Sequence, residues 1–217
     1  INRLEDHVAS ARMKTTPVID FEKNESLKGL DYLDTIYHAI VNEHPIQLKY
    51  RSFKARSANS FIFYPYLLKE YRNRWFVYGV RGNGRILQNL ALDRIQSLEV
   101  LPQEHYIKNT FFDPNTFFND LVGVTKNSGS VAEKVGFKVA AAEAPYIITK
   151  PIHRSQQVVE RLADGSVILE IEVVINHELE RVFFGYAEGI QVLYPKTLVE
   201  LMGRKLKKAA EQYTHSK

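Results

Sequence analysis

The residues best suited to chemistry are concentrated in one stretch of the chain, between Pro45 and Ile95. This segment contains ten of the 29 lysines and arginines but only two of the 25 acidic residues, which gives it a net charge of +8 in a chain whose total is +4. It also contains ten aromatic side chains. Cations interleaved with aromatic rings can hold phosphate groups and stack on nucleobases. A β-rich core with a charged, solvated rim gives the same composition, so both interpretations stay open here.

No spacing in the sequence indicates a catalytic or metal centre. The seven histidines include no pair at i, i+4, and the stretch from His177 to Glu180 lacks the second histidine of a zinc motif. There is no nucleophile elbow and no phosphate loop, and a tight hairpin turn explains Gly82-Asn83-Gly84. The absence of cysteine excludes disulfides, cysteine zinc fingers and thiol catalysis. The sequence therefore predicts a protein that is not an enzyme, with no catalytic residues, no metal ligands and no cofactor.

Short strands must position the basic segment. Ser26 is expected to cap a helix with an apolar face, and Pro45 to end it. From Ile46 to Tyr50 the period of the apolar pattern changes to two. Similar strand patterns follow, at residues 61–64, 75–78, 86–92 and 95–101. By alternation, Trp75 and Val77 share one face of their strand, and Phe76 and Tyr78 share the other. One helix and five strands with tight turns predict a small barrel or a strongly bent sheet.

In the last part of the chain, expected strands alternate with expected helices. Its expected elements are strands at 135–140, 156–162, 167–175 and 189–194, and helices at 142–149, at 177–186 and from Pro195 onward. The order βαββαβ, followed by a helix, predicts a ferredoxin-like α+β layer. We expect a linker or helical remnant at 1–25, a first domain at 26–105, a connector at 106–130 and a second domain at 131–217. Within the connector, Asp113-Pro114 is expected to open a short helix through Phe117, Phe118 and Leu121.

The chain resembles the WYL domain family. The resemblance rests on three stretches, which are Tyr64 to Lys69, Asn73 to Gly79, and Leu92-Asp93-Arg94-Ile95, with the name-giving triplet present as Trp75-Phe76-Val77. The second domain resembles the WYL C-terminal extension through Pro151 to Gln156, Asp164-Gly165, and Val192 to Pro195. The chain is identified as the C-terminal part of a bacterial WYL transcriptional regulator without its winged helix-turn-helix, which agrees with a start at Ile1.

The resemblance implies an Sm-like or SH3-like barrel that senses a ligand and controls DNA binding by an N-terminal domain. Read together with the basic segment, it predicts a pocket for a phosphate-bearing ligand, either single-stranded nucleic acid or a nucleotide. The expected ligand-binding residues are Tyr50, Arg51, Lys69, Trp75, Tyr78, Arg81 and Arg94. Many members of the family have two arginines where this chain has Gln88 and Ala91. Arg81 and Arg85 are candidates to replace them.

The same resemblance implies a homodimer in the bacterial cytoplasm. No apolar run approaches the roughly 20 residues that span a bilayer, and no signal peptide is visible, so no membrane partner is expected. The alternative function is a dimerisation or scaffold module without a ligand. A nucleotide-processing enzyme is a third hypothesis, which no motif supports.

Overall fold

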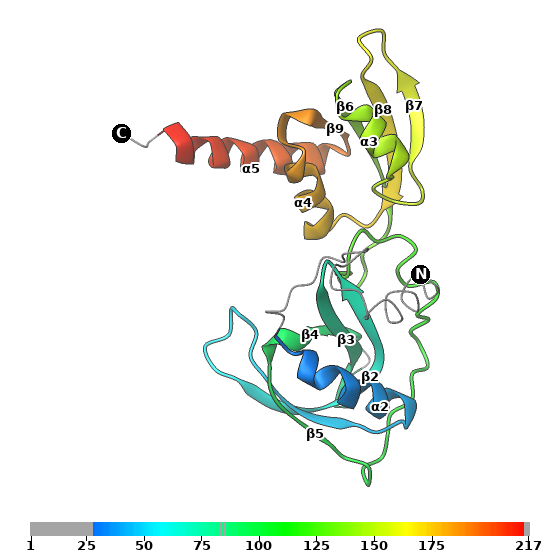
Figure 1. Cartoon of the computed structure of the whole chain (residues 1–217), viewed down its shortest axis with the longest axis vertical. Coiled ribbons are helices and arrows are strands. Elements are labelled where there is room, and N and C mark those ends of the chain that lie inside the picture. The colour runs from blue at the N-terminus through cyan, green and yellow to red at the C-terminus, as the bar shows by residue number, and fades with distance from the viewer. Residues whose placement is uncertain (1–27, 83, 85, 215–217) are drawn as a thin grey trace, which may run out of the picture.

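The computed structural model describes residues 28–82, 84 and 86–214. It contains two modules of mixed α and β structure, and each is built on its own antiparallel sheet (Figure 1). We call residues 30–100 the first module, residues 133–214 the second module, and residues 101–132 the connecting segment. The expected α+β class is confirmed. The expected linker at 1–25 and the proposed cap at Ser26 lie outside the described residues.

The first module begins with a 3-10 turn, Leu30–Tyr32, and the helix α2, Leu33–Val41. Five strands follow in the sheet order β4-β3-β2-β1-β5. Their bounds are β1 Ile46–Tyr50, β2 Asn59–Tyr71, β3 Arg74–Arg81, β4 Gln88–Ala91 and β5 Ile95–Val100. Among the described residues β4 and β5 remain the two edges of this sheet, so the expected closed barrel is not formed.

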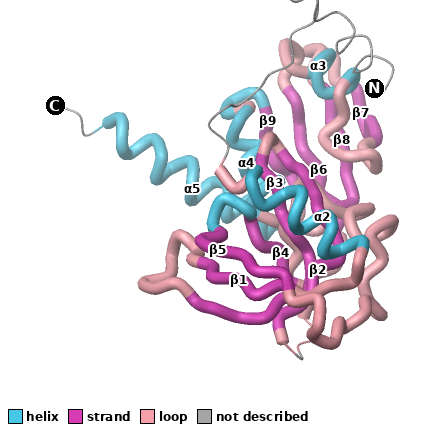
Figure 2. Tube along the Cα trace, turned by 60° about the horizontal axis from the view of Figure 1, so that its bottom comes forward, coloured by secondary structure: helices cyan, strands magenta, loops and turns pink. Residues whose placement is uncertain are grey.

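Apolar alternation fixes the faces of this sheet. Ile46, Leu48, Phe63 and Val77 are fully buried and pack with Ile36 of α2. Figure 2 shows α2 lying across the strands on this side. Because successive strand residues point to opposite faces, their neighbours in sequence point away from α2.

The opposite face of the first sheet is covered by the connecting segment. Tyr78 is buried there with Phe112 and Val124, and Phe117 and Phe118 pack around them. The ring of Tyr78 lies 5.3 Å from that of Phe118, edge to face. The expected short helix at Asp113 is replaced by a series of turns. The connecting segment is thus an aromatic part of the core rather than a free linker.

The second module has the predicted order of elements. These are β6 Glu133–Val139, α3 Ala144–Thr149, β7 Gln157–Arg161, β8 Val167–Val173, α4 His177–Gly185, β9 Ile190–Tyr194 and α5 Lys196–Thr214. The sheet order is β7-β8-β6-β9, and all pairs are antiparallel. The likeness of this layer to a ferredoxin fold, and that of the first module to an Sm fold, stay predictions.

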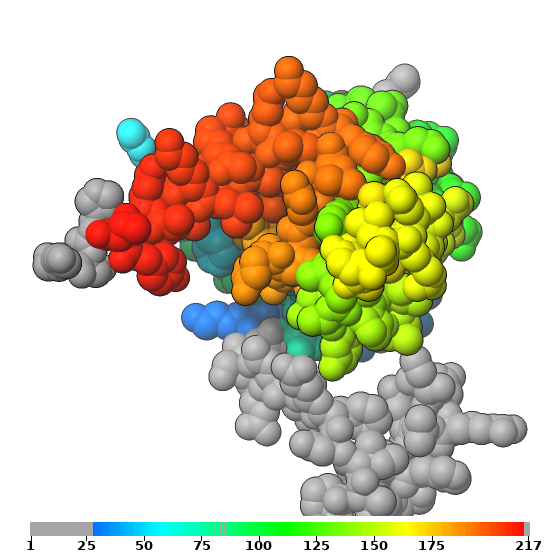
Figure 3. Space-filling model, turned by 90° about the horizontal axis from the view of Figure 1, so that it is seen from above, coloured from blue at the N-terminus to red at the C-terminus, as the bar shows by residue number. Residues whose placement is uncertain are grey.

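The core of the second module lies between its sheet and its helices. Phe137, Leu169 and Ile171 from the sheet pack with Leu179 and Phe183 from α4. The last helix, α5, has buried residues only in its first half and then extends away from the sheet (Figures 1 and 3). No helix in the described part of the chain is both long and apolar enough to cross a membrane.

Candidate ligand-binding cleft

A cleft of about 780 Å³ lies between the two modules. The β2–β3 hairpin, the β1–β2 loop and the 3-10 turn before β5 line it on the first module, and the start of α4 lines it on the second. Its polar lining residues are Arg72, Asn73, Arg74, Asn89, Arg94, Thr125, His177, Glu178 and Arg181. We call this hollow the inter-module cleft.

The charge of the cleft is strongly unbalanced. Its lining contains four arginines from both modules, and Glu178 is the one carboxylate among the described residues that line it. A cleft lined by one sign of charge concentrates the electrostatic field and attracts counter-ions. The guanidinium group offers a planar fork of donors that matches phosphate oxygens two at a time. The arrangement therefore suits an anionic ligand with phosphate groups.

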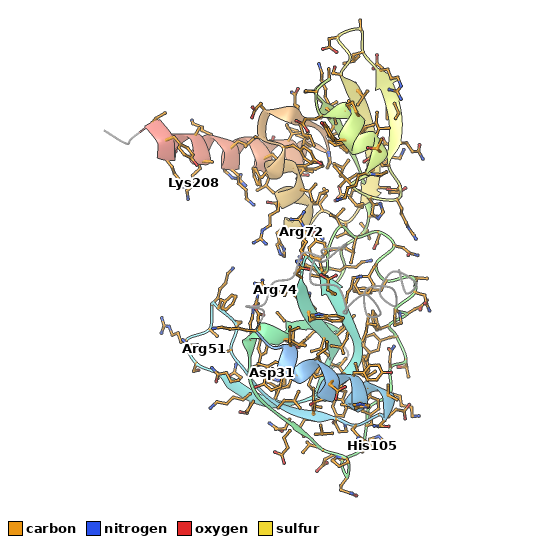
Figure 4. The ribbon with its side chains drawn as sticks, viewed as in Figure 1. Asp31, Arg51, Arg72, Arg74, His105 and Lys208 are labelled. Carbon is orange, nitrogen blue, oxygen red and sulfur yellow. The ribbon has the colours of Figure 1, made fainter. Side chains whose placement is uncertain are left out.

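The tip of the β2–β3 hairpin carries two of these arginines. Tyr71 pairs with Arg74, which leaves Arg72 and Asn73 as a two-residue turn with φ of 50° and 60°. Such a turn matches the twist of the flanking strands, and asparagine tolerates its left-handed backbone. The backbone N–H of Asn73 donates to Glu70 Oε1 at 2.5 Å. The hairpin thereby carries Arg72 and Arg74 toward α4, as Figure 4 shows.

Arg94 lies at the floor of the cleft, in the 3-10 turn Leu92–Arg94. Its side chain is 27% exposed, and its Nε lies 3.9 Å from Asp93 Oδ1, which is too far for a hydrogen bond. Asp93 also meets Arg74 Nε at 3.3 Å through its other oxygen. Arg94 Nε and Asp93 Oδ1 are buried without a hydrogen-bond partner. Since buried polar groups are normally paired, the hydrogen bonding of this Asp93–Arg94 pair is incomplete.

Two aromatic side chains flank Arg94. Its guanidinium carbon lies 4.5 Å from the ring centre of Phe53, which is 74% exposed. Burial raises the pKa of the Tyr50 hydroxyl, although the adjacent Arg94 acts in the opposite direction. The Tyr50 hydroxyl is therefore neutral at physiological pH, where it can donate or accept a hydrogen bond. Phe53 is the ring best placed to stack on a ligand.

The second module contributes the start of α4. Asn176 caps this helix by accepting a hydrogen bond from the Leu179 N–H at 2.9 Å. Glu178 is buried, and its Oε1 accepts a hydrogen bond from Thr125 Oγ1 at 2.7 Å, while its Oε2 has no partner. Gly123, with φ of 94°, permits this approach, because a Cβ there would lie 2.5 Å from Glu178 Cγ.

A smaller cavity of about 310 Å³ continues on the first module. It shares Phe53 and Arg94 with the inter-module cleft and adds Arg51, whose backbone N–H donates to the Arg94 carbonyl at 3.2 Å. The two hollows thus meet at the Phe53–Arg94 pair. An extended anion could run from one into the other.

The structure brings together three of the seven predicted ligand-binding residues. Arg94 lines both hollows, Arg51 lines the smaller one, and Tyr50 lies beside Arg94. These three come from the end of β1 and the turn before β5, which pair directly.

The other four predicted residues lie elsewhere. Lys69 Nζ lies 4.2 Å from the ring centre of Phe118, and Trp75 packs against the core beneath α2. Tyr78 is only 2% exposed and donates its hydroxyl proton to the Val124 carbonyl. Arg81 stacks on Phe61 at the far end of β3 from Arg74. Alternation and strand length explain this separation, because these side chains leave different faces and ends of the hairpin.

Sequence reasoning missed most of the inter-module cleft. The overlooked residues are Phe53, Arg72, Arg74, Asn89, His177 and Arg181. A signal existed for two of them, because Arg72 and Arg74 flank a turn residue, Asn73, between two strand patterns. Ala91, at a position where the resemblance led us to expect an arginine, also lines the cleft. Of the two departures from the family pattern, Ala91 therefore lies at this cleft, whereas Gln88 does not line it.

Within the described residues, no group of three or more histidine, aspartate and glutamate side chains is placed to hold a metal ion. The cleft lining includes four arginines, Phe53 and Asn89.

Among the solved structures that resemble this chain, two illustrate the range of similarity. The chain is 16% identical to proteasome accessory factor B/C (PafBC) of Arthrobacter aurescens, with a TM-score of 0.35, over 88% of this chain and 28% of that one. It is 13% identical to a CRISPR Cas-related protein known from a crystal structure, with a TM-score of 0.51, over 86% of this chain and 53% of that one. The second likeness indicates a shared fold. The chain spans about a quarter and about half of these two proteins, and no curated protein matches it.

Family models match both modules. The model of the WYL domain matches residues 31–100, and the model of the WCX domain matches residues 132–210. The two matches follow one another in the order that the sequence motifs indicated, and together they cover most of the chain. The chain therefore belongs to the WYL family, with a WYL domain followed by a WCX domain.

Proposed function

We propose that this chain is the ligand-sensing regulatory part of a bacterial transcription regulator, and that it binds a phosphate-bearing ligand in the inter-module cleft. The ligand class is single-stranded nucleic acid or a nucleotide. The observation that carries the proposal is the convergence of four arginines on one cleft that contains a single carboxylate. Its volume of about 780 Å³ lies within the range of small-molecule sites, roughly 300–1,000 Å³.

Each part of the cleft has a distinct role in this proposal. Arg74 and Arg94, which both line the cleft, bind phosphate oxygens through their guanidinium groups. Phe53 stacks on a base, a contact that tolerates any base sequence. Asn89, whose amide donates to the Val124 carbonyl, retains its side-chain oxygen as an acceptor for a base N–H.

Regulation follows from differential binding. A ligand changes the activity of a regulator only if it favours one arrangement of the protein over another. In the proposed mechanism, the regulator acts in the cytoplasm. Ligand binding to this chain favours one position of a DNA-binding domain that belongs to the same regulator. The proposal is that the two cavities bind a ligand without catalysing a reaction. Clear turnover in a nuclease or phosphatase assay would contradict it.

The direct test is binding of a short, fluorescein-labelled, single-stranded oligonucleotide of mixed sequence, followed by fluorescence anisotropy at several salt concentrations. We expect binding at low salt that weakens as salt rises, since phosphate contacts release counter-ions. Arg94→Ala and Phe53→Ala should each weaken it about tenfold or more, because base stacking alone contributes about 1–3 kcal/mol per base. Phe53 is exposed, so its variant should fold normally.

Arg81→Ala is the matched control. It removes an arginine of the same basic segment, but one that lies on Phe61 at the other end of β3. It should leave binding within about twofold of the parent chain. Absence of binding at low salt would overturn the proposed function, and equal losses for Arg81→Ala and Arg94→Ala would overturn its location.

A second candidate is a dimerisation module, which the last helix favours. Leu206 is 41% exposed and Tyr213 is 85% exposed, on the part of α5 that extends from the second module (Figure 3). Size exclusion with light scattering tests this candidate. A dimer that is lost in the double variant Leu206→Glu, Tyr213→Glu would support it, and a monomer at all concentrations would remove it.

A further inference from the structure

We propose that the WCX domain supplies a direct phosphate contact, Arg181, so that one ligand is held by both domains at once and fixes them to each other. This inference rests on the proposed function and deepens it, because it makes the second module part of the sensor. It also assigns the regulatory step, in which ligand binding ties α4 to the β2–β3 hairpin.

The position of Arg181 is the first support. It follows Glu178 by three residues, so both side chains leave the same face of α4 and line the cleft. Arg181 is exposed and makes no ion pair with any described residue. Arg181 has no acidic partner among those residues and lines the same cleft as three other arginines, so the four positive charges repel one another when no anion is bound. An anionic ligand that contacts Arg181 would remove this repulsion.

Tyr71 lines the cleft and lies within electrostatic range of charged groups from both modules. Burial raises the pKa of its hydroxyl, with Arg72 and Arg181 acting to lower it and Glu178 acting to raise it. The Arg72 guanidinium also lies 5.6 Å from the Tyr71 ring centre. Charges from the hairpin and from α4 therefore act on the same side chain. A phosphate placed near it would be within reach of arginines from both domains.

Residues 122–125 of the connecting segment would transmit the effect. The Val124 carbonyl accepts hydrogen bonds from Tyr78 and Asn89 of the first module. The neighbouring carbonyls of Val122 and Thr125 accept from Asn176 Nδ2 of the second module at 3.0 and 2.9 Å. We call residues 122–125 the shared strip. Because both domains bind the same strip, tightening the cleft stabilises the start of α4 as well.

The experiment compares Arg181→Ala with Arg161→Ala, using the whole chain and the labelled oligonucleotide described above. Arg161 is an exposed arginine of the same domain, in β7 and outside the cleft. We expect Arg181→Ala to weaken binding about tenfold at low salt and to reduce the magnitude of the salt slope by about 1, as for the loss of one phosphate contact. Arg161→Ala should change neither quantity.

Hydrogen–deuterium exchange gives an independent readout on the unmodified protein. Saturation with the oligonucleotide should slow exchange in α4 and in the shared strip, as well as around Arg94. Binding with full affinity in Arg181→Ala, or protection confined to the first module, would overturn this inference and leave the proposed function standing. No binding of the oligonucleotide by the parent chain would overturn both.

Discussion

Glu178 is the one acidic residue among the described residues that line the inter-module cleft. It places one carboxylate among four arginines, and one of its oxygens has no hydrogen-bond partner. A buried carboxylate is costly to the folded state unless it is paired or hydrogen-bonded. Thr125 donates a hydrogen bond to Oε1 of Glu178, and His177 Nε2 lies 3.3 Å from the same oxygen. The negative charge of Glu178 opposes an anionic ligand. Glu178 therefore limits the affinity of the cleft.

The residue-scale prediction concerns Glu178→Gln. The amide oxygen can still accept the hydrogen bond from Thr125, so the variant should fold as the parent does. Removal of the charge should tighten oligonucleotide binding about three- to tenfold at low salt, and the gain should shrink as salt screens it. Fluorescence anisotropy measures the change.

Glu180→Gln is the control for this prediction, because Glu180 bonds to Lys205 of α5 and does not line the cleft. It should leave the affinity unchanged. Weaker binding in Glu178→Gln would show that the carboxylate assists the ligand instead of repelling it.

The β2–β3 hairpin is the element that determines the shape of the cleft. Its strand β2 is longer than the sequence pattern indicated, since it runs through Pro65 with a bulge in its pairing to β3. Gly79 faces this bulge, where a Cβ would lie 2.1 Å from the Tyr64 carbonyl oxygen. A bulge increases the local bend of a strand pair. The close approach at Gly79 thus allows the hairpin to curve as its tip extends toward the second module.

The element-scale prediction is that Arg72→Gly separates stability from binding. Glycine adopts the positive φ of this position without strain, which offsets its larger loss of backbone entropy. The free energy of unfolding should stay within about 0.5 kcal/mol of the parent value. Oligonucleotide affinity should fall about fivefold because one phosphate contact is lost.

Urea unfolding and fluorescence anisotropy test the two halves of this prediction. Arg72→Lys keeps the charge and should retain most of the affinity. A large loss of stability in Arg72→Gly, with affinity unchanged, would mean that Arg72 supports the turn and has no part in binding.

Most elements followed from local pattern. The strand Ile46–Tyr50 was predicted with its observed bounds, and Trp75 and Val77 share a core face as alternation required. The failures have local causes as well. Period-two alternation does not predict how far β2 continues past a proline, because pairing with β3 decides it. The turns after Asp113 replace the expected helix because Phe112, Phe117 and Phe118 pack on Tyr78 instead.

At the scale of the whole molecule, the side chain of Asn176 has two roles. It caps α4, and it attaches the second module to the shared strip. Its oxygen caps α4, and its amide nitrogen bonds two carbonyls of the shared strip. Loss of an N-cap costs about 1 kcal/mol, and buried carbonyls left unpaired add a similar amount. Asn176 therefore couples the folding of α4 to that of the first domain.

The whole-molecule prediction is that Asn176→Ala separates the unfolding of the two domains. Trp75 is the only tryptophan and lies in the first domain, so its fluorescence reports on that domain, while circular dichroism reports on both. In the parent chain the two urea transitions should coincide. In Asn176→Ala the circular dichroism transition should begin earlier, with the second domain destabilised by about 2 kcal/mol.

Asn176→Ser keeps a capping oxygen but is too short to reach the shared strip, so it isolates the attachment. It should separate the transitions with a smaller loss of stability. Transitions that coincide in both variants would contradict the coupling.

The inter-module cleft could not be predicted from local sequence patterns, because its residues come from two domains that are far apart in the sequence. Arg94 was identified from its motif, but Arg181 belongs to a different domain and carries no local signal. A site between two domains depends on how they dock, and docking is determined by long-range contacts such as Asn176 to Val122. Local patterns predict which face a side chain occupies, and not which domain lies opposite it.

The shared strip has one more consequence, for how this family can change in evolution. Its carbonyls at Val122, Val124 and Thr125 bond to the second, the first and again the second module. One inserted or deleted residue in this strip would shift the register of these hydrogen bonds, so that each carbonyl would face a different partner. We therefore expect length variation among natural relatives to accumulate in the preceding part of the connecting segment or in surface loops, and the two domains to be inherited and exchanged as one unit.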